Sequence, residues 1–282
     1  MPMPEAVVTT VALPAPVAPA PPPRPEITGK AEILMLGDSQ ISFGAGGAYR
    51  AFLSNLGASC AGLPTAFARA DAAAIGVRSS ALHHWTTSRA DQRGVICDVD
   101  AKYGVNAGSY GVSSKGLSYV QIGADPNYPF CPSGRSALQA VFDAPAYDPD
   151  LLILSFLGNA TDRLQSASQA AADWSAAQAQ IPSGVACLVM STIPSFEASE
   201  NSRRQTAQDN LAAAVRAGGR CAFLAGFTPR TRAAFEGNAD NFRTNDAGKV
   251  IDTRHPTSAS AKRFVDLQTP AFCAAIASAL SK

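Results

Sequence analysis

Five short apolar runs, separated by segments with helical periodicity, most strongly constrain what this 282-residue chain can fold into. Short apolar runs bounded by glycine or small polar residues are typical of strands buried on both faces of a parallel sheet. Strands that alternate with helices predict one α/β domain of three layers (α/β/α), with a five-stranded, mostly parallel sheet. The predicted strands lie in residues 33–36, 72–77, 151–156, 184–190 and 221–226.

Three segments between these runs are predicted to be helical, and so is the C-terminal segment. Residues 48–57 carry apolar side chains at i, i+3, i+4 and i+7, followed by a glycine stop. Residues 166–181 and 202–219 predict two further helices, the second closed by a Gly-Gly pair. From Thr257 onward we expect two helical pieces divided at Pro270, because proline inside a helix removes a backbone hydrogen bond and clashes with the preceding turn.

The charge balance excludes several classes of partner. The chain has 23 basic and 22 acidic side chains, a formal net charge of +1, and no long run of like charge. Nothing therefore indicates a nucleic acid or an anionic membrane surface as partner. No stretch approaches the roughly 20 consecutive apolar residues that a membrane-spanning helix needs. The composition leaves the oligomeric state open.

The first thirty residues differ in kind from the rest. Nine of the chain's twenty prolines precede residue 26, which predicts a disordered or semi-rigid polyproline II linker at 1–30 and a folded domain at 31–282. The segment does not resemble a signal peptide, since Arg24 is its first basic residue and Glu5 is acidic. A tether to an upstream export signal or membrane anchor would have this composition, and so would a linker truncated behind a start codon.

A second segment, residues 88–134, lacks core periodicity and predicts an insertion lobe. It is rich in Gly, Ser, Tyr, Asn and Asp and holds four of the six tyrosines. Long loops of this kind are usually functional or disordered. We interpret the lobe as a contact surface and take Tyr110 and Tyr119 as candidate substrate-binding residues.

The six cysteines form an even set, which permits disulfides in an exported protein. The alternative is that they are small buried hydrophobes. That interpretation is strongest for Cys187 and Cys273, which lie in apolar periodic segments. Cys97 and Cys131 border the lobe, so we expect a disulfide between them. This favours an extracytoplasmic protein, whether periplasmic, secreted or envelope-tethered.

The first apolar run leads directly into Gly37-Asp38-Ser39. Ligands of open α/β sheets bind outside the carboxyl ends of the strands, which is where Ser39 would lie. The alternative is an ordinary turn or helix-cap serine. A serine becomes nucleophilic when an imidazole, oriented by a carboxylate, removes its proton. Asp252 precedes His255 by three residues, a spacing that lets its carboxylate reach Nδ1 and leaves Nε2 to face Ser39.

With these motifs the chain resembles the SGNH/GDSL hydrolases. That family carries Gly-Asp-Ser after its first strand, a glycine after its second, an asparagine block after its third and Asp-x-x-His before its last helix. Gly37-Asp38-Ser39, Gly76, Asn159 and Asp252-Thr253-Arg254-His255 occur here in that order. Four blocks in order are specific, where one alone is weak. The resemblance covers roughly residues 31–280 except the lobe and implies the flavodoxin-like fold of the family.

The resemblance implies a site and a mechanism that needs no cofactor. Ser39 would attack an acyl carbonyl, His255 would carry the proton and Asp252 would orient the imidazole. The Ser39 and Gly76 backbone N–H groups and the Asn159 side-chain amide would form the oxyanion hole.

The chain departs from the family pattern at several positions. In the third block, Leu157 and Ala160 stand where the family has glycine and aspartate. Asp162 could take over the structural role of the missing carboxylate, or the loop could be shaped differently. Gln40 replaces the usual leucine after the serine, which we expect to matter little. We interpret Asp38 as structural, because neighbouring side chains on a tight turn point apart.

His83, His84 and Trp85 follow the second predicted strand. A paired-histidine metal site would need further ligands, and no carboxylate or cysteine lies beside them at helical spacing. We therefore predict no metal. We expect the three residues to pack at the base of the lobe, with Trp85 as a wall on which a sugar could stack.

These features predict a serine esterase that removes short acyl groups, foremost O-acetyl, from a carbohydrate or cell-wall polymer outside the cytoplasm. The polar lobe and the lack of the long apolar lid that a lipase needs favour this substrate class. An O-acyltransferase using the same triad would have the same sequence features. A third interpretation is a binding or structural module that keeps the fold but has lost its catalytic activity. The absence of the third-block aspartate is compatible with such a loss.

Overall fold

The computed structural model describes residues 31–41, 45–64, 67, 72–77, 79–87, 134–143 and 147–282. The predicted linker and nearly all of the predicted lobe lie outside the described residues. Tyr110, Tyr119 and the predicted Cys97–Cys131 bridge lie outside them as well.

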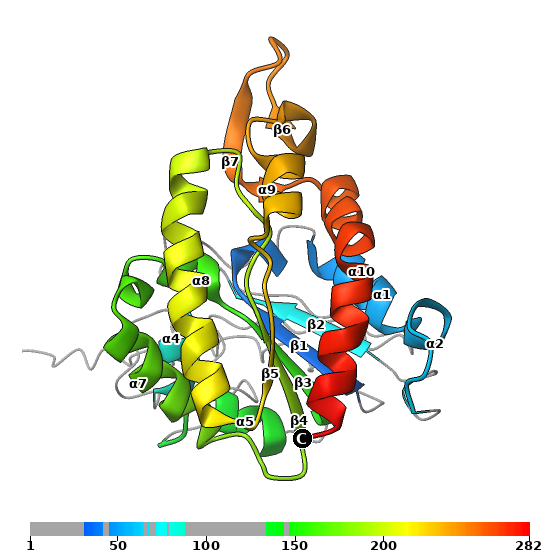
Figure 1. Ribbon diagram of the computed structural model, residues 1–282, viewed down its shortest axis with the longest axis vertical. Coiled ribbons are helices and arrows are strands. Elements are labelled where there is room, and N and C mark those ends of the chain that lie inside the picture. Colours follow the sequence, from blue (N-terminus) through cyan, green and yellow to red (C-terminus); the bar gives the residue numbers. More distant parts are fainter. Residues whose placement is uncertain are drawn as a thin grey trace, which may run out of the picture.

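The sheet confirms the predicted α/β fold. Its five strands run in the order β2-β1-β3-β4-β5, and every pairing between them is parallel (Figure 1). The strands are β1 (Ala31–Gly37), β2 (Ala72–Gly76), β3 (Tyr147–Ser155), β4 (Ala186–Met190) and β5 (Ala222–Leu224). This is the strand order of flavodoxin-like sheets, in which the direction of winding reverses between β1 and β3.

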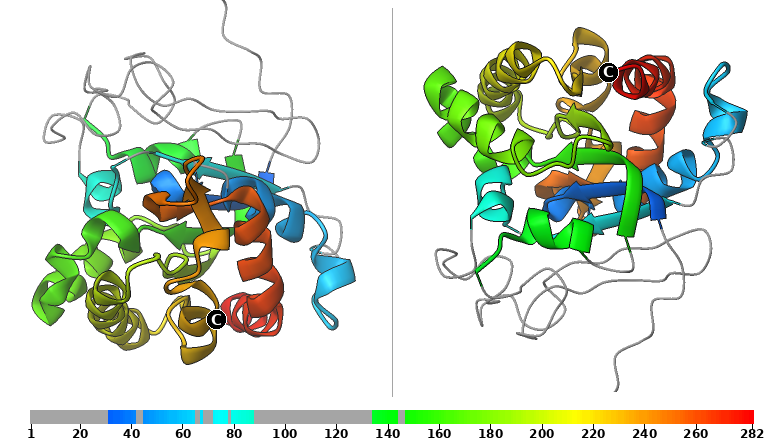
Figure 2. Two further views of the ribbon diagram at one scale, coloured as in Figure 1. Left: turned by 90° about the horizontal axis from the view of Figure 1, so that it is seen from above. Right: turned by 90° about the horizontal axis from the view of Figure 1, so that it is seen from below.

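Helices cover both faces of the sheet (Figure 2). The helices and 3₁₀ turns are α1 (Gly46–Leu53), α2 (Leu56–Ser59), α4 (Leu82–Thr86), α5 (Ala137–Asp143), α6 (Leu157–Ala160), η3 (Arg163–Gln165), α7 (Ala167–Gln178), α8 (Ala198–Gly218), α9 (Pro229–Phe235), η4 (Ala239–Asn241) and α10 (Ser258–Leu280). Leu34 and Leu36 of β1 pack with the layer of α4, α5, α7 and α8. Ile33 and Met35 face the layer of α1, α2, α9 and α10. Two covered faces explain the continuous apolar runs of the strands.

A β-hairpin stands apart from this sheet. Strands β6 (Phe242–Thr244) and β7 (Val250–Pro256) pair antiparallel in a separate two-stranded sheet. The hairpin projects beyond the ends of α8 and α10 (Figure 1). The sequence pattern did not predict it, since neither strand has an apolar run.

The C-terminal segment corrects one prediction. Instead of two pieces divided at Pro270, a single helix, α10, contains this proline. A proline in a helix interior costs about 3 kcal/mol. Phe264 and Phe272 are fully buried on either side of it, and burying one such side chain contributes about 1.5–3 kcal/mol. Core packing on both sides therefore outweighs the local penalty.

Two disulfides correct the reading of Cys187 and Cys273 as buried hydrophobes. Cys60 pairs with Cys273, and Cys187 pairs with Cys221. The partners are 213 and 34 residues apart in sequence, and the fold brings Cys60, directly after α2, to α10 and pairs β4 with β5. Disulfides persist in oxidising compartments, so both bridges are consistent with an extracytoplasmic protein.

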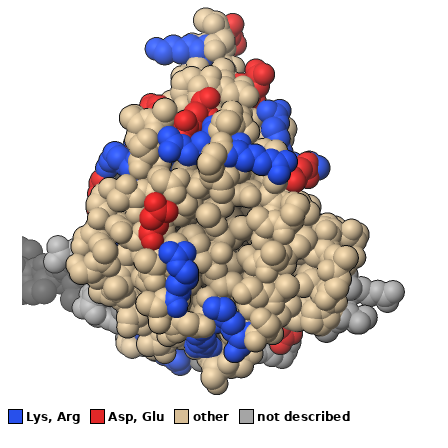
Figure 3. Space-filling model, viewed as in Figure 1, with Lys and Arg blue, Asp and Glu red and all other residues tan. Residues whose placement is uncertain are grey.

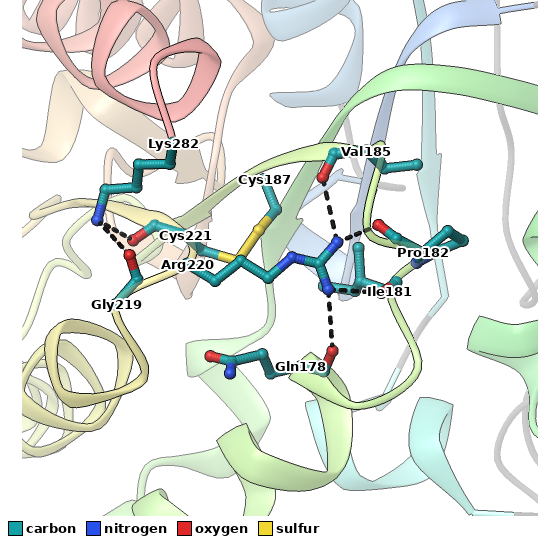
Figure 4. Close-up of a disulfide and its surroundings, with 9 residues drawn as sticks. All are labelled: Gln178, Ile181, Pro182, Val185, Cys187, Gly219, Arg220, Cys221 and Lys282. Atoms are coloured by element: carbon teal, nitrogen blue, oxygen red, sulfur yellow. Dashed lines mark hydrogen bonds between the residues drawn. A yellow bond between two sulfur atoms is a disulfide. The ribbon is translucent and has the colours of Figure 1, made fainter.

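The Cys187–Cys221 bridge lies at the amino-terminal ends of β4 and β5, opposite the strand ends that precede the candidate site. Next to it, the Arg220 guanidinium donates to the main-chain carbonyl groups of Ile181 and Pro182, and Lys282 donates to the Cys221 carbonyl (Figure 4). The Lys282 contact joins the last residue of the chain to the start of β5, and the Arg220 contacts join the loop after α7 to the same end of the sheet.

The surface agrees with the balanced composition. On the face shown in Figure 3, acidic and basic side chains are interspersed. Arg203 pairs with Glu200, Arg232 with Glu236 and Lys262 with Asp266. None of the helices among the described residues combines the length and the apolar composition that a membrane-spanning helix requires.

Candidate active site

The candidate site lies at the carboxyl ends of the strands, where β1 and β3 adjoin. Ser39 follows β1, and Asn159 lies in α6, directly after β3. Ligands of such sheets bind at the point where the winding direction reverses. Gly37 permits a tight turn before the serine, because a Cβ on it would lie 2.2 Å from Cγ1 of Ile41.

Ser39, His255 and Asp252 lie in one hydrogen-bonded chain. His255 Nε2 lies 2.9 Å from Ser39 Oγ. On the other side of the ring, His255 Nδ1 lies 3.0 Å from Asp252 Oδ2 and 3.1 Å from Oδ1. The Asp252 carboxylate also accepts the His255 backbone N–H at 3.0 Å. A serine, an imidazole and a carboxylate in this order can activate the hydroxyl as a nucleophile.

The hairpin supplies a residue that the sequence reasoning missed. Arg243 of β6 donates a hydrogen bond to Asp252 Oδ2. Burial alone would raise the pKa of Asp252, but Arg243 and the backbone N–H groups of His255 and Arg254 outweigh it and lower this pKa to about 2. The carboxylate is therefore ionised throughout the neutral range.

The electrostatics keep His255 available as a base. Partial burial lowers the pKa of its imidazole below the usual value, and the neighbouring Asp252 carboxylate only partly opposes this shift. The ring is therefore neutral at neutral pH, which is the form that accepts a proton from a serine.

Asp38 connects the serine turn to the loop that carries Asn159. Its buried carboxylate accepts the Gln40 N–H at 2.9 Å and also the backbone N–H groups of Gly158 and Asn159. A Cβ on Gly158 would lie 2.7 Å from Asp38 Oδ2, so glycine permits this close approach. Burial raises the pKa of Asp38 to about 6, against the effect of these hydrogen bonds and of the Arg204 charge. Asp38 thus has the structural placement expected for it.

Asp162 does not replace the missing carboxylate of the third block. Its side chain is exposed and pairs with Arg203 of α8. Asp38 makes the contacts to this loop instead, and Ala160 is buried in the core.

The loop after β2 bears on the predicted role of Gly76 as an oxyanion donor, which stays a prediction. The Val77 N–H points toward β1, where it donates to the Gly37 carbonyl oxygen at 3.0 Å. Because successive amides of a strand point to opposite sides, the Gly76 N–H points away from the strand that leads to Ser39. Ser79, three residues further along, has a left-handed φ of 60°. Asn159 Nδ2 donates to the Ser80 carbonyl oxygen at 3.0 Å, so this loop lies beside Asn159.

Gln40, which stands where we expected a side chain of little consequence, makes several contacts of its own. Its side chain is buried and bonds to the main chain of Ile193 and Arg254. Arg254 lies between Asp252 and His255, so this contact reaches the strand that carries both.

The structure does not support Trp85 as a sugar-stacking wall. Trp85 is fully buried, its ring centroid lies 5.5 Å from that of Phe156, and Nε1 donates to Ser80 Oγ at 3.3 Å. The ring thus has no face open to a sugar. The His83 and His84 rings pack with centroids 3.9 Å apart. In the described part of the chain, no three His, Cys, Asp or Glu side chains lie close enough together to hold a metal ion.

Comparison with known proteins adds no assignment. No protein-family model matches the chain, and no curated protein is significantly similar to it in sequence.

Proposed function

We propose that this protein is a serine ester hydrolase of the SGNH/GDSL type. One observation carries the proposal, namely the chain of contacts from Ser39 Oγ through the His255 ring to the Asp252 carboxylate, at 2.9 and 3.0 Å. The order of the Gly-Asp-Ser, asparagine and Asp-x-x-His blocks and the flavodoxin-like strand order support the family assignment.

The proposed mechanism is acyl transfer through Ser39. His255 Nε2 takes the hydroxyl proton as Oγ forms a bond to the carbonyl carbon of the ester. The proton then passes from Nε2 to the leaving alcohol as the ester C–O bond breaks, which leaves an acyl-serine. Water attacks this intermediate with His255 again as base, and the acid and free serine are released. Asp252 holds the ring orientation and stabilises the imidazolium.

Three N–H groups are proposed to stabilise the oxyanion. They are the Ser39 backbone amide, the Asn159 side-chain amide and, in place of Gly76, the backbone amide of Ser79. Strained backbone conformations concentrate at functional sites, and the left-handed φ of Ser79 next to Asn159 motivates this choice. Removing one such donor typically costs about 10²- to 10³-fold in rate.

The proposed substrates are short acyl esters, foremost O-acetyl groups on a carbohydrate or cell-wall polymer. The polar, tyrosine-rich segment 88–134 motivates the polymer. The two disulfides fit a location outside the cytoplasm. Transfer of the acyl group to a sugar hydroxyl would use the same first half-reaction.

A fluorophosphonate probe and a substrate series test this proposal. The probe should label Ser39 of the wild-type protein, as located by mass spectrometry, because only an activated serine reacts. p-Nitrophenyl acetate should be cleaved faster than p-nitrophenyl octanoate, and an acetylated polysaccharide should release acetate. Ser39→Ala and His255→Ala should abolish these activities and keep the circular-dichroism spectrum. An adduct at another residue, or unchanged activity of Ser39→Ala, would reject the mechanism and favour a binding module.

A further inference from the structure

The strand that carries Asp252 and His255 is not part of the sheet that leads to Ser39. β7 pairs only with β6 in the part of the chain that the structure describes, whereas Ser39 lies two residues after the end of β1. No ladder of β-sheet hydrogen bonds therefore fixes the imidazole relative to the hydroxyl. Other contacts must hold the distance of 2.9 Å between them.

Gln40 supplies such a contact, one residue after Ser39. Its Nε2 donates to the Arg254 carbonyl oxygen at 3.0 Å and to the Ile193 carbonyl oxygen at 3.1 Å. Its Oε1 accepts the Ile193 N–H at 2.9 Å. The side chain is 6% exposed, so water cannot readily replace these partners. One amide thus joins the nucleophile turn, the loop after β4 and the segment between Asp252 and His255.

We infer that Gln40 is a positioning residue, which sets the place of the His255 ring relative to Ser39 without touching the reacting atoms. This inference rests on the proposed function. Its physical basis is the steep dependence of catalysis on geometry, since a misplacement of about 1 Å can cost about 10²-fold in rate. A leucine, which SGNH/GDSL hydrolases usually carry here, would leave three buried main-chain groups without these partners.

Gln208 provides a matched control. It is also a glutamine, 3% exposed, and it too makes three hydrogen bonds with its side-chain amide. Oε1 accepts from Ser191 Oγ at 2.5 Å and from the Phe227 N–H at 2.9 Å, and Nε2 donates to the Phe227 carbonyl oxygen at 3.1 Å. None of these three contacts involves Ser39, Asp252 or His255. Loss of the Gln208 amide should therefore destabilise the fold to a similar extent without displacing the imidazole.

The experiment compares Gln40→Leu with Gln208→Leu. Both should lower the midpoint of thermal unfolding. Only Gln40→Leu should lower kcat for p-nitrophenyl acetate, by about 10- to 100-fold, with KM unchanged, because substrate binding does not involve the ring position. The rate of fluorophosphonate labelling of Ser39 should fall in parallel. Equal activity losses in the two variants, or no loss in either, would overturn the inference.

A second pair covers the case in which the leucine variants do not fold. Gln40→Glu and Gln208→Glu keep the side-chain volume but replace the donating amide with a carboxylate oxygen. As with the leucine pair, only the Gln40 variant should lose kcat.

A spectroscopic readout separates this inference from the proposed function. NMR resonances of the His255 ring should shift in Gln40→Glu and stay in place in Gln208→Glu. If wild-type protein cleaves no ester, the proposed function fails, while unshifted His255 resonances in both glutamate variants would reject the positioning role itself.

Discussion

The Asn159 side chain donates a hydrogen bond from Nδ2 to the Ser80 carbonyl oxygen at 3.0 Å. This bond joins the loop after β3 to the loop after β2, across β1, which lies between these strands in the sheet. Asp38 holds the first loop through the Gly158 and Asn159 N–H groups. The backbone and the side-chain amide of Asn159 are thus both held in place by hydrogen bonds. Such a preorganised amide is well suited to stabilise a developing oxyanion.

Asn159→Ala should therefore lower kcat by about 10²-fold with little change in KM, since the amide acts chiefly when negative charge develops on the substrate oxygen. Steady-state kinetics with p-nitrophenyl acetate measure both constants. Asn159→Asp is the matched variant, because it keeps the shape and removes the donor, and it should lose at least as much. An unchanged kcat in both variants would place Asn159 outside the oxyanion hole.

Replacing Arg243 should shift the pH dependence of activity. Burial chiefly lowers the pKa of His255, and the Arg243 charge lowers it further, so Arg243→Ala should raise it. The base must be neutral, so the acid limb of kcat/KM should move to higher pH. Asp252, with its pKa near 2, stays ionised and does not set this limb. Arg243→Lys keeps the charge and should restore the wild-type profile. Superimposable profiles of Arg243→Ala and wild type would contradict this account.

The same substitution should affect stability at low pH. The pKa of Asp252 is lower in the folded protein than its ordinary value, so the stability it contributes is present above that ordinary pKa and is lost as pH falls toward 2. Without Arg243 the folded-state pKa rises, and acid unfolding should begin at a higher pH. Because Arg243 is about half exposed, the difference should shrink in high salt.

The sheet could be predicted from sequence because its strands are buried on both faces. Each of the five predicted runs overlaps a strand, since continuous apolar residues admit few alternatives. The His255 and Asp252 contacts follow from a spacing of three residues, which confines the carboxylate to the vicinity of the ring. Local sequence patterns were sufficient to predict those features that depend on the residues of one short segment.

Contacts between distant segments could not be predicted in this way. The hairpin strands β6 and β7 show no apolar run, so neither they nor the Arg243–Asp252 pair left a signal. Gln40 reaches Arg254 across 214 residues, and Cys60 pairs with Cys273 across 213. In α10, core burial overrides the local effect of Pro270, which only tertiary structure reveals.

Substitutions at Ser79 should test its left-handed backbone. A non-glycine residue with positive φ is strained by about 1–3 kcal/mol, and glycine adopts this conformation freely. Ser79→Gly should therefore keep kcat, and its free energy of unfolding should equal that of the wild type or exceed it by up to about 1 kcal/mol. The gain is small because glycine also increases the entropy of the unfolded chain, which offsets part of the relieved backbone strain. Ser79→Val should lose both stability and kcat, since β-branched residues tolerate positive φ worst. Denaturant unfolding and ester hydrolysis measure the two effects, and wild-type behaviour of Ser79→Val would show that the conformation is not required.

Removal of the Cys187–Cys221 bridge should destabilise the protein without affecting catalysis. The bridge closes a sequence separation of 34 residues, which corresponds to about 4 kcal/mol in the chain-entropy model. It lies at the amino-terminal ends of β4 and β5, whereas Ser39 and Asn159 follow the carboxyl ends of β1 and β3. The double variant Cys187→Ala/Cys221→Ala should therefore unfold at lower denaturant concentration and keep its kcat where it is folded. The variant Cys60→Ala/Cys273→Ala removes the other bridge and should behave in the same way. A large fall in kcat of the fully folded variant would show instead that the amino-terminal ends of the strands are coupled to the active site at their carboxyl ends.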